Sequence, residues 1–178
     1  MNKSEVPIRM AYWLVPSEPW LQSLQKTTNE LATRFDGPFF EPHATIYFGA
    51  FDSRDPVSDI LDSLEDFGEV ELITKSLLFG DKFTQSCFIE FESSLVLSQM
   101  NQIVSSQIYQ RENYSAVPHL SLFYGALALG ERRDVENNIT LPKLAKFNLV
   151  KVIANPPKVA SKRDVEFWNE RARRFLRP

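Results

Sequence analysis

The sequence is poor in the residues that build disulfides and metal sites, with one cysteine and two histidines among 178 residues. A single cysteine excludes an internal disulfide, and the apolar run CFIEF favours a buried structural thiol at Cys87 over a nucleophile. The two histidines lie 76 positions apart, and the chain has no CxxC, HxH or HExxH motif. Because these are the usual spacings of metal ligands, we predict a protein that uses no metal and no other cofactor.

Long apolar runs are also absent from the sequence. The first residues, MNKSEVPIRMAYWLVP, lack the uninterrupted apolar stretch of roughly 7 to 15 residues that a signal peptide needs, and no stretch approaches the roughly 20 residues of a membrane span. With 43% hydrophobic residues, the chain can bury about two thirds of its unfolded surface. We therefore expect a soluble globular protein of the cytoplasm with no membrane partner.

Positive charge is scarce over most of the chain and concentrated at its end. Residues 1–142 hold 10 Lys or Arg against 20 Asp or Glu, whereas residues 143–178 hold 10 against 3. Basic segments of this kind are more often a solvated face, or paired with acidic side chains, than a flank that attracts phosphates; both interpretations stay open. The acidic remainder argues against binding of duplex nucleic acid, since such binding depends on many Lys and Arg contacts to phosphates.

Both histidines lie in a nine-residue repeat. PHATIYFGA, residues 42–50, and PHLSLFYGA, residues 118–126, share the Pro, His, Gly and Ala, and the one marked change is Ala44 against Leu120. From the composition of the chain, the chance that both histidines follow a proline and precede a Ser or Thr by two positions is on the order of 10⁻⁴. Duplication of a purely structural strand is the alternative explanation, but a core strand favours aliphatic residues over titratable ones.

The same 76-residue offset relates the segments before the repeat. MAYWLV (10–15) and SCFIEF (86–91) are rich in β-favouring residues, and residues 18–35 and 94–111 carry apolar residues at helical spacing. Each half therefore predicts a strand, a helix and a second strand that opens at its histidine. Elsewhere we expect a helix near 56–66, strands near 69–79 and 83–91, a short helix near 130–138 and a strand near 144–154, while residues 163–176 fit a helix or a strand.

Alternation along the two histidine strands indicates their chemistry. His43 and Thr45 share one face of the first strand, as His119 and Ser121 share one face of the second. If the strands converge, two imidazoles and two hydroxyls meet in one cleft. Imidazoles can act as general base and general acid near neutral pH, and hydroxyls can donate hydrogen bonds to phosphate oxygens without a metal. This combination suits phosphodiester chemistry.

At these residues the chain resembles the two-histidine (2H) phosphoesterases, a superfamily defined by paired HxT/S motifs. Within it, the sequence is most similar to the cyclic nucleotide phosphodiesterase branch related to plant cyclic phosphodiesterase. The resemblance rests on Trp13 in YWLVP, on GPFFEPHAT before and within the first motif, on FTQSCF at 83–88 and on PHLSLFY at 118–124. It covers most of residues 10–126.

The resemblance implies an α+β fold with a bilobal architecture. Two antiparallel sheets, related by a pseudo-twofold axis, would face each other across a central cleft, with helices on the outside. Residues 1–178 would form a single bilobal domain, whose HxT lobe is centred on residues 10–50 and whose HxS lobe is centred on residues 83–126.

The resemblance also implies an activity, the metal-independent hydrolysis of cyclic phosphates on ribose. The substrates would be nucleoside 2′,3′-cyclic phosphates or ADP-ribose 1″,2″-cyclic phosphate. By this likeness His119 activates water and His43 protonates the departing ribose oxygen, with the reverse assignment as the alternative. Thr45 and Ser121 would bind the phosphate.

Three aromatic residues complete the site that the resemblance implies. Trp13 would stack on a base or close the cleft, and Tyr124 would help to order the site. Strict alternation places Tyr124 on the face opposite His119, so its role requires a β-bulge near the strand end. Phe83 would lie beside the cleft. For all three residues, packing in the core is the competing interpretation.

Two other classes of function stay open. An RNA 2′,3′-cyclic phosphodiesterase or a 2′,5′ RNA ligase-like enzyme would act on RNA ends, and should have a more basic cleft than this acidic sequence suggests. A non-catalytic nucleotide-binding module would keep the fold and lose the chemistry. We expect the partner to be a small nucleotide with a cyclic phosphate, RNA ends being the alternative, and the protein to be a monomer.

Overall fold

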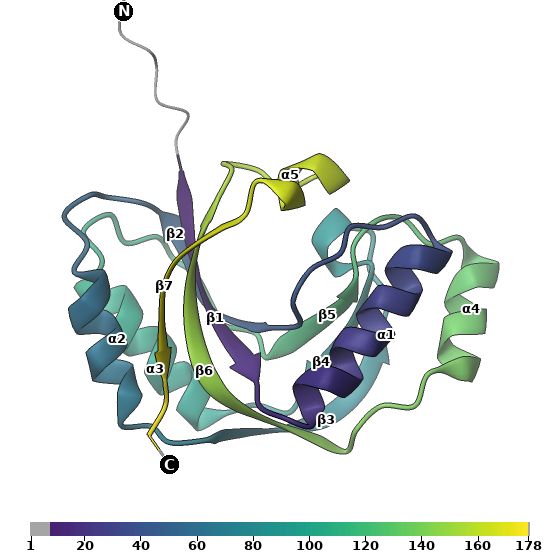
Figure 1. Ribbon diagram of the computed structural model, residues 1–178, viewed down its shortest axis with the longest axis horizontal. Helices are drawn as coiled ribbons and strands as arrows, with labels where there is room; N and C mark the ends of the chain where they lie inside the picture. Colours follow the sequence, from purple (N-terminus) through teal and green to yellow (C-terminus); the bar gives the residue numbers. More distant parts are fainter. Residues whose placement is uncertain (1–7, 178) are drawn as a thin grey trace, which may run out of the picture.

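A computed structural model describes residues 8–177, so residues 1–7 and 178 of the predicted domain lie outside it. The described part contains seven strands, five α-helices and one short 3₁₀ turn (Figure 1). In chain order these are β1 (Arg9–Pro16), α1 (Trp20–Arg34), β2 (Ala44–Ala50), α2 (Val57–Glu65), β3 (Val70–Leu78), the 3₁₀ turn (Phe83–Gln85), β4 (Cys87–Phe91), α3 (Leu95–Gln107), β5 (His119–Phe123), α4 (Leu129–Asn138), β6 (Leu144–Asn155), α5 (Lys162–Glu166) and β7 (Asn169–Phe175).

All seven strands belong to one antiparallel sheet in the order β1-β2-β5-β4-β3-β6-β7. Strand β6 is 12 residues long; residues 144–147 pair with β3, and residues 147–155 pair with β1. Because β1 also pairs with β2, the strands return on themselves and the sheet is strongly curved (Figure 1). The predicted combination of helices with antiparallel strands is confirmed. The predicted division into two lobes with facing sheets is not, since β6 and the β2–β5 contact join all the strands.

Helices cover both ends of the curved sheet. In Figure 1, α1 and α4 lie at one end, α2 and α3 at the other, and α5 lies beyond the edge of the sheet. Helix α1 packs against β5 and α3 packs against β2, so each helix covers a histidine strand from the other half of the repeat. The buried residues of α1 include Leu24, Thr28 and Leu31, at the spacing the sequence predicted. Over residues 8–177, no helix combines the length and the apolar character that crossing a membrane requires.

Two segments differ in detail from the prediction. The strand expected over 83–91 begins only at Cys87, because Phe83–Gln85 forms a 3₁₀ turn. Residues 163–176, which fitted a helix or a strand, contain both. Ser161 caps the short helix α5 by accepting a hydrogen bond from the backbone N–H of Asp164, and β7 then pairs with β6. A helix and a strand have different residue periods, so their succession within one short segment explains why the sequence showed neither period clearly.

The basic C-terminal segment pairs with acidic side chains. Arg174 bonds Asp62 in α2, Arg177 bonds Asp66 at the end of that helix, and Arg173 bonds a glutamate of its own strand. Such exposed pairs contribute at most about 1 kcal/mol each. Arg174 and Arg177 therefore pair with the acidic body of the protein, whereas Arg173 pairs within the segment.

Cys87 lies at the start of β4 with no exposed surface. Burial raises the pKa of its thiol to about 12. Since the thiolate is the nucleophilic form of cysteine, a thiol held protonated in this way is inert near neutral pH. The structural interpretation of Cys87 is therefore confirmed.

Candidate active site

The two histidine motifs meet at one point of the sheet. Strands β2 and β5 share a single pair, Ala44 and Leu120, which are the middle residues of the two motifs and are fully buried. In an antiparallel register, this pair sets each histidine opposite the hydroxyl residue of the other motif. All four polar side chains project from the face opposite Ala44 and Leu120. Imidazoles and hydroxyls therefore occupy alternate corners of one cluster.

Both histidine rings are held by the same type of backbone contact. Nδ1 of His43 donates to the carbonyl of Glu41 at 2.7 Å, and Nδ1 of His119 donates to the carbonyl of Val117 at 2.8 Å. In each case the acceptor lies two residues earlier, with a proline between. Proline keeps the preceding residue extended, so the same ring contact forms in both motifs. Because Nδ1 carries the proton, each neutral ring has its lone pair on Nε2.

His43 is the more deeply buried histidine, with 7% of its surface exposed. Its ring stacks on the indole of Trp13, with centroids 3.6 Å apart and planes at 9°, and the ring of Trp168 meets it edge-on at 6.0 Å. Burial lowers the pKa of His43 to about 3, although the bond to the Glu41 carbonyl acts in the opposite direction. His43 is therefore neutral in the free protein near neutral pH.

His119 is half-buried, and its surroundings favour the neutral imidazole. The side-chain amide of Gln85 donates to its Nε2 at 3.1 Å. Burial is the main cause that lowers the pKa of His119, and the positive charge of Lys82 acts in the same direction, against the bond to Val117. The ring edge of His119 also packs against Phe88 at 5.7 Å. This histidine therefore offers an oriented lone pair.

Each motif hydroxyl lies against a tyrosine. Burial raises the pKa of Tyr114 to about 12, and the neighbouring Thr45 hydroxyl acts in the opposite direction. Burial also raises the pKa of Tyr124, and the neighbouring Ser121 hydroxyl acts in the opposite direction. The Ser121 Oγ donates its own proton to the carbonyl of Thr84 at 2.8 Å. Both phenols therefore stay protonated, and they add O–H donors to those of the two motifs.

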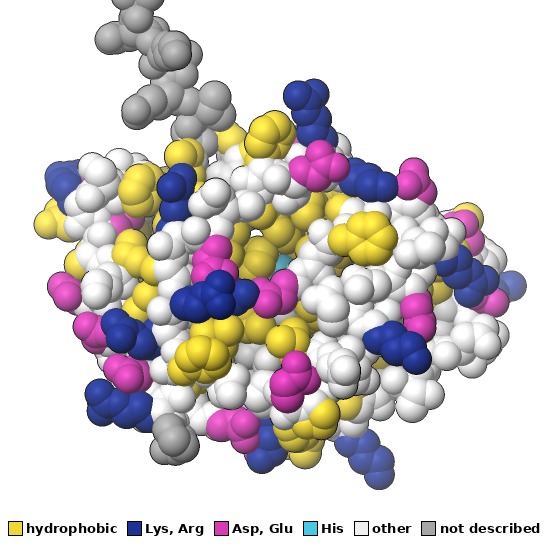
Figure 2. Space-filling model, in the orientation of Figure 1, with side chains coloured by type: hydrophobic (Ala, Val, Ile, Leu, Met, Phe, Trp, Pro, Cys, Tyr) yellow, Lys and Arg dark blue, Asp and Glu magenta, His cyan; other side chains and the backbone are white. Residues whose placement is uncertain are grey.

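A cavity of about 450 Å³ brings these groups together. Figure 2 shows a hollow on the face drawn there, with a histidine side chain at its floor. Of the described residues that line the cavity, two are lysines, Lys82 and Lys158, and none carries a carboxylate. In a chain of net charge −3, this locally positive lining suits an anionic ligand. The other lining residues are Ala11, Trp13, His43, Thr45, Phe48, Thr84, Gln85, Tyr114, His119, Ser121, Tyr124, Asn155, Pro157, Val159 and Trp168.

The three predicted aromatic residues take different positions around the histidines. Trp13 is 5% exposed and one face of its indole is covered by His43, which favours ordering of the site over stacking on a base. Tyr124 lines the cavity. The register between β4 and β5 shifts at Leu122, so β5 has the bulge that brings Tyr124 to the same side as His119. Phe83 packs against Tyr124 at 6.0 Å and is not among the described residues that line the cavity.

The lining residues that were not identified from the sequence include Tyr114, Lys82, Gln85 and Trp168. Tyr114 precedes the second motif, but the 76-residue offset sets Pro38 opposite it, so the repeat carries no signal. Gln85 lies within the stretch FTQSCF, in which no pattern marks it. Trp168 lies between the α5 helix and β7, in the segment whose character was ambiguous.

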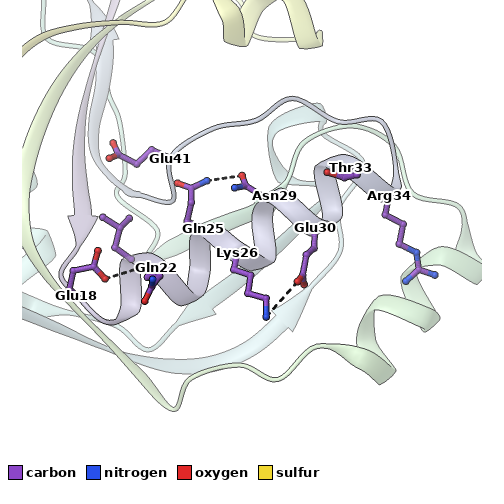
Figure 3. A pocket seen from close by; sticks show the side chains of 10 residues that line it. Glu18, Gln22, Gln25, Lys26, Asn29, Glu30, Thr33, Arg34 and Glu41 are labelled. Carbon is purple, nitrogen blue, oxygen red and sulfur yellow. Dashed lines mark hydrogen bonds and ion pairs between the residues drawn. The ribbon is translucent and has the colours of Figure 1, made fainter.

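A wider concave region of about 810 Å³ lies along the outer face of α1 (Figure 3). It is helix surface with local contacts, such as the Lys26–Glu30 ion pair and the bond from Gln25 to Asn29. None of the described residues that line it is a histidine or a tyrosine. Within residues 8–177, no group of three or more His, Cys, Asp or Glu side chains is arranged to hold a metal ion. The histidine cavity is the candidate active site because it holds both histidines and both motif hydroxyls.

Comparison with known proteins identifies the family of the chain. The model of a family described as cyclic phosphodiesterase-like protein matches residues 8–168. A cyclic phosphodiesterase of Arabidopsis thaliana is 23% identical over 125 residues, which make up 70% of this chain and 69% of that protein. The fold is similar to that of E. coli LigT complexed with 3′-AMP, with a TM-score of 0.58 at 13% identity over 96% of this chain and 98% of that chain. The apo form of LigT gives 0.57 at 14% identity over 97% and 99%. At these identities the structural similarity concerns the fold alone.

Proposed function

The chain belongs to the cyclic phosphodiesterase-like protein family of the 2H phosphoesterases, and we propose that it hydrolyses cyclic phosphates on ribose without a metal. The substrates we propose are nucleoside 2′,3′-cyclic phosphates or ADP-ribose 1″,2″-cyclic phosphate. The observation that carries the proposal is the meeting of both histidine motifs at one residue pair beside one cavity. This arrangement offers a general base, a general acid and donors to phosphate in a single site.

In the proposed reaction a water oxygen attacks phosphorus and one ribose oxygen leaves. Nε2 of His119 takes a proton from the attacking water, and Nε2 of His43 gives a proton to the departing oxygen. The P–O bond to ribose breaks as the P–O bond to water forms, which leaves a phosphomonoester and a free ribose hydroxyl. Proton transfer through solvent from His119 to His43 then restores the starting state.

The surroundings of His119 support its role as the base. A base must begin neutral with its lone pair directed at the water, and the amide of Gln85 already donates to Nε2 of this ring. Lys82 opposes protonation of His119 in the free protein. The attacking water would take the place of the Gln85 amide at Nε2 of His119 when the reaction begins.

His43 needs a proton before it can act as the acid, and burial opposes this in the free protein. Two features favour its charged form: the Glu41 carbonyl accepts from Nδ1, and the stacked face of Trp13 stabilises an imidazolium by a cation–π interaction. A phosphate anion about 4 Å away would add about 4 kcal/mol at an effective dielectric constant near 20. At about 1.4 kcal/mol for each pKa unit, this attraction is comparable in size with the lowering of the His43 pKa by burial. Binding of the substrate phosphate would thus favour the protonated form of His43, which is the form that acts as the acid.

Thr45→Ala or Ser121→Ala should lower kcat by about 10²-fold, because each variant removes an O–H donor to the phosphate oxygens. In the free protein Ser121 donates to the carbonyl of Thr84, so it must rotate toward the phosphate when substrate binds. The measurement is steady-state hydrolysis of 2′,3′-cyclic AMP. Thr45→Ser and Ser121→Thr keep the hydroxyl and are the matched controls. Full activity in both alanine variants would show that the hydroxyls are structural.

The distribution of charge supports a small nucleotide over an RNA end as the substrate. Lys82 and Lys158 in the cavity can meet one or two phosphates. Arg174 and Arg177 of the C-terminal segment are paired with acidic side chains, which leaves them poorly placed to follow a phosphate backbone. Binding of a long single strand depends on many such contacts, and each adds about −0.7 to the slope of log affinity against log salt.

Affinity for 2′,3′-cyclic AMP should therefore equal or exceed affinity for a short RNA that ends in a 2′,3′-cyclic phosphate. The salt slope should be shallow, near that of one or two phosphate contacts. KM and kcat/KM for both substrates, measured over a range of salt concentrations, test this expectation. Affinity that climbs with RNA length, together with a steep salt slope and sensitivity to charge reversal at Arg171, would instead favour the RNA phosphodiesterase.

A further inference from the structure

A buried lysine forms ion pairs with two partly exposed glutamates, one of them in the loop that leads to His43. Lys151 of β6 is 8% exposed, and its Nζ lies 2.8 and 2.7 Å from the two carboxylate oxygens of Glu41 and 3.3 Å from Glu170 of β7. Burial of a lysine charge is costly, and a buried ion pair often adds little to stability compared with apolar residues of similar size. The position of this pair therefore invites a functional explanation.

Lys151 is connected to His43 by two routes. The first route passes through Glu41. Its carboxylate binds Lys151, and its backbone carbonyl accepts a hydrogen bond from Nδ1 of His43. Through the β1–β6 pairing Lys151 lies directly opposite Trp13, and residues opposite each other in a sheet share a face. Trp13 in turn carries the ring of His43 on its indole at 3.6 Å. The four residues are thus linked by an ion pair, a hydrogen bond, a ring stack and a strand pairing.

The loop that carries Glu41 is also anchored from the other side. Gln25 of α1 donates its side-chain N–H to the carbonyl of Phe40 at 2.9 Å. Figure 3 shows the Glu41 carboxylate directed away from α1 toward the neighbouring strands. The backbone before His43 is therefore held between α1 and β6, with Lys151 as the anchor on the strand side.

The second motif is held differently. The carbonyl that accepts from His119 belongs to Val117, which is 57% exposed and whose side chain cannot form an ion pair. The buried anchor is thus specific to the histidine that is stacked, deeply buried and proposed as the acid. An acid must direct its proton at one departing oxygen, so small errors in its orientation are costly.

We propose that Lys151 is a positioning residue that acts through Glu41 and Trp13 to hold the His43 imidazole in one orientation and one tautomer, with Nε2 directed into the cavity. The proposal rests on the function proposed for His43 and extends it to residues outside the cavity wall. Without Lys151 the Glu41 loop would lose its anchor. The ring of His43 would then rotate, or exchange its proton between Nδ1 and Nε2.

Lys151→Met should lower kcat by about 10- to 100-fold, with KM changed by less than about threefold, since misplacement by about 1 Å can cost this much. Lys151→Arg can still bind the carboxylate of Glu41 and should recover most of the loss. Lys146→Met is the matched control. Lys146 lies in the same strand, binds Glu69 and Glu71 at 3.1 and 2.8 Å, and is not among the described residues that line the cavity. Its kcat should equal that of the wild type.

The tautomer of His43 is a second readout, measured by ¹⁵N NMR on untagged protein without substrate. Only two histidines contribute ring signals, and His119→Gln identifies those of His43. The wild type, Lys151→Arg and Lys146→Met should show the Nδ1–H form, whereas Lys151→Met should show a mixture. This measurement needs no turnover. An inactive wild type would refute the proposed function and leave the tautomer result standing.

A wild-type tautomer and a wild-type kcat in Lys151→Met would overturn the positioning role. Equal losses in Lys151→Arg and Lys151→Met would do the same, because the ion pair would then not be the cause. If Lys151→Met does not fold, Glu41→Gln weakens the same contact with a smaller change in volume. It should show the same losses at lower magnitude, and wild-type values in both readouts would again contradict the proposal.

Discussion

His43→Ala and His119→Ala are each expected to lower the turnover of a 2′,3′-cyclic nucleotide by about 10²–10⁴-fold or more. The two rings lie in motifs that share the Ala44–Leu120 pair and line one cavity, so both can act on one phosphate. Each variant removes one proton transfer from the same transition state. The losses should therefore be strongly non-additive, and the double variant should be little worse than either single variant.

Controls for this prediction must separate chemistry from folding. His43 stacks on Trp13, so its loss also removes packing, and His43→Gln is the closer match in size. Circular dichroism and thermal unfolding should show the same fold in each variant. Near-wild-type turnover in a folded single variant would remove that histidine from the chemistry. Additive losses would indicate that the two rings act in separate steps.

Acid should begin to destabilise the protein through His43 near pH 6.5, which is above the range in which carboxylates titrate. Burial lowers the pKa of His43 to about 3 in the folded protein, whereas an unfolded histidine titrates near 6.5. Between these values the unfolded chain binds the additional proton, so the free energy of unfolding falls as the pH falls. The slope is at most about 1.4 kcal/mol per pH unit, or roughly 4–5 kcal/mol from pH 6.5 to 3. Above about pH 6.5 this contribution is constant.

Chemical denaturation of the wild type and of His43→Gln at pH 7.5, 6.5, 5.5 and 4.5 measures this effect. From pH 6.5 to 4.5 the wild type should lose roughly 2–3 kcal/mol more than the variant. His119, whose pKa burial also lowers, contributes in both proteins and cancels in the difference. If the wild type and His43→Gln lose stability equally as the pH falls, His43 is hydrated in the folded state. That result would contradict the proposal that His43 is a buried acid.

The core of the candidate site could be predicted from sequence because it is encoded locally and twice. The spacing of His43 and Thr45, and of His119 and Ser121, sets each pair on one strand face whatever the rest of the fold does. The recurrence of the motif then predicted that the pairs meet. The relationship to the 2H phosphoesterases that these motifs suggested is confirmed by the family match.

The rest depends on contacts between distant residues, which no local pattern specifies. Strand β6 joins the sheet into one because its two parts pair with different partners, and a strand pattern does not name its partners. In the sequence, Lys151 is one of the basic residues of the C-terminal segment. Its contact with Glu41, which lies 110 residues earlier, is visible only in the structure. Trp13 was a candidate platform for a base, yet the ring that stacks on it belongs to His43.

The central claim is that paired histidines hydrolyse a cyclic phosphate without a metal. Its most direct test follows 2′,3′-cyclic AMP by ³¹P NMR with untagged protein in excess EDTA. The account predicts conversion to a phosphomonoester of adenosine at the rate seen without chelator, with that conversion abolished in His43→Ala and in His119→Ala. Activity that disappears with EDTA and returns with a divalent cation, or that survives in both histidine variants, would contradict it.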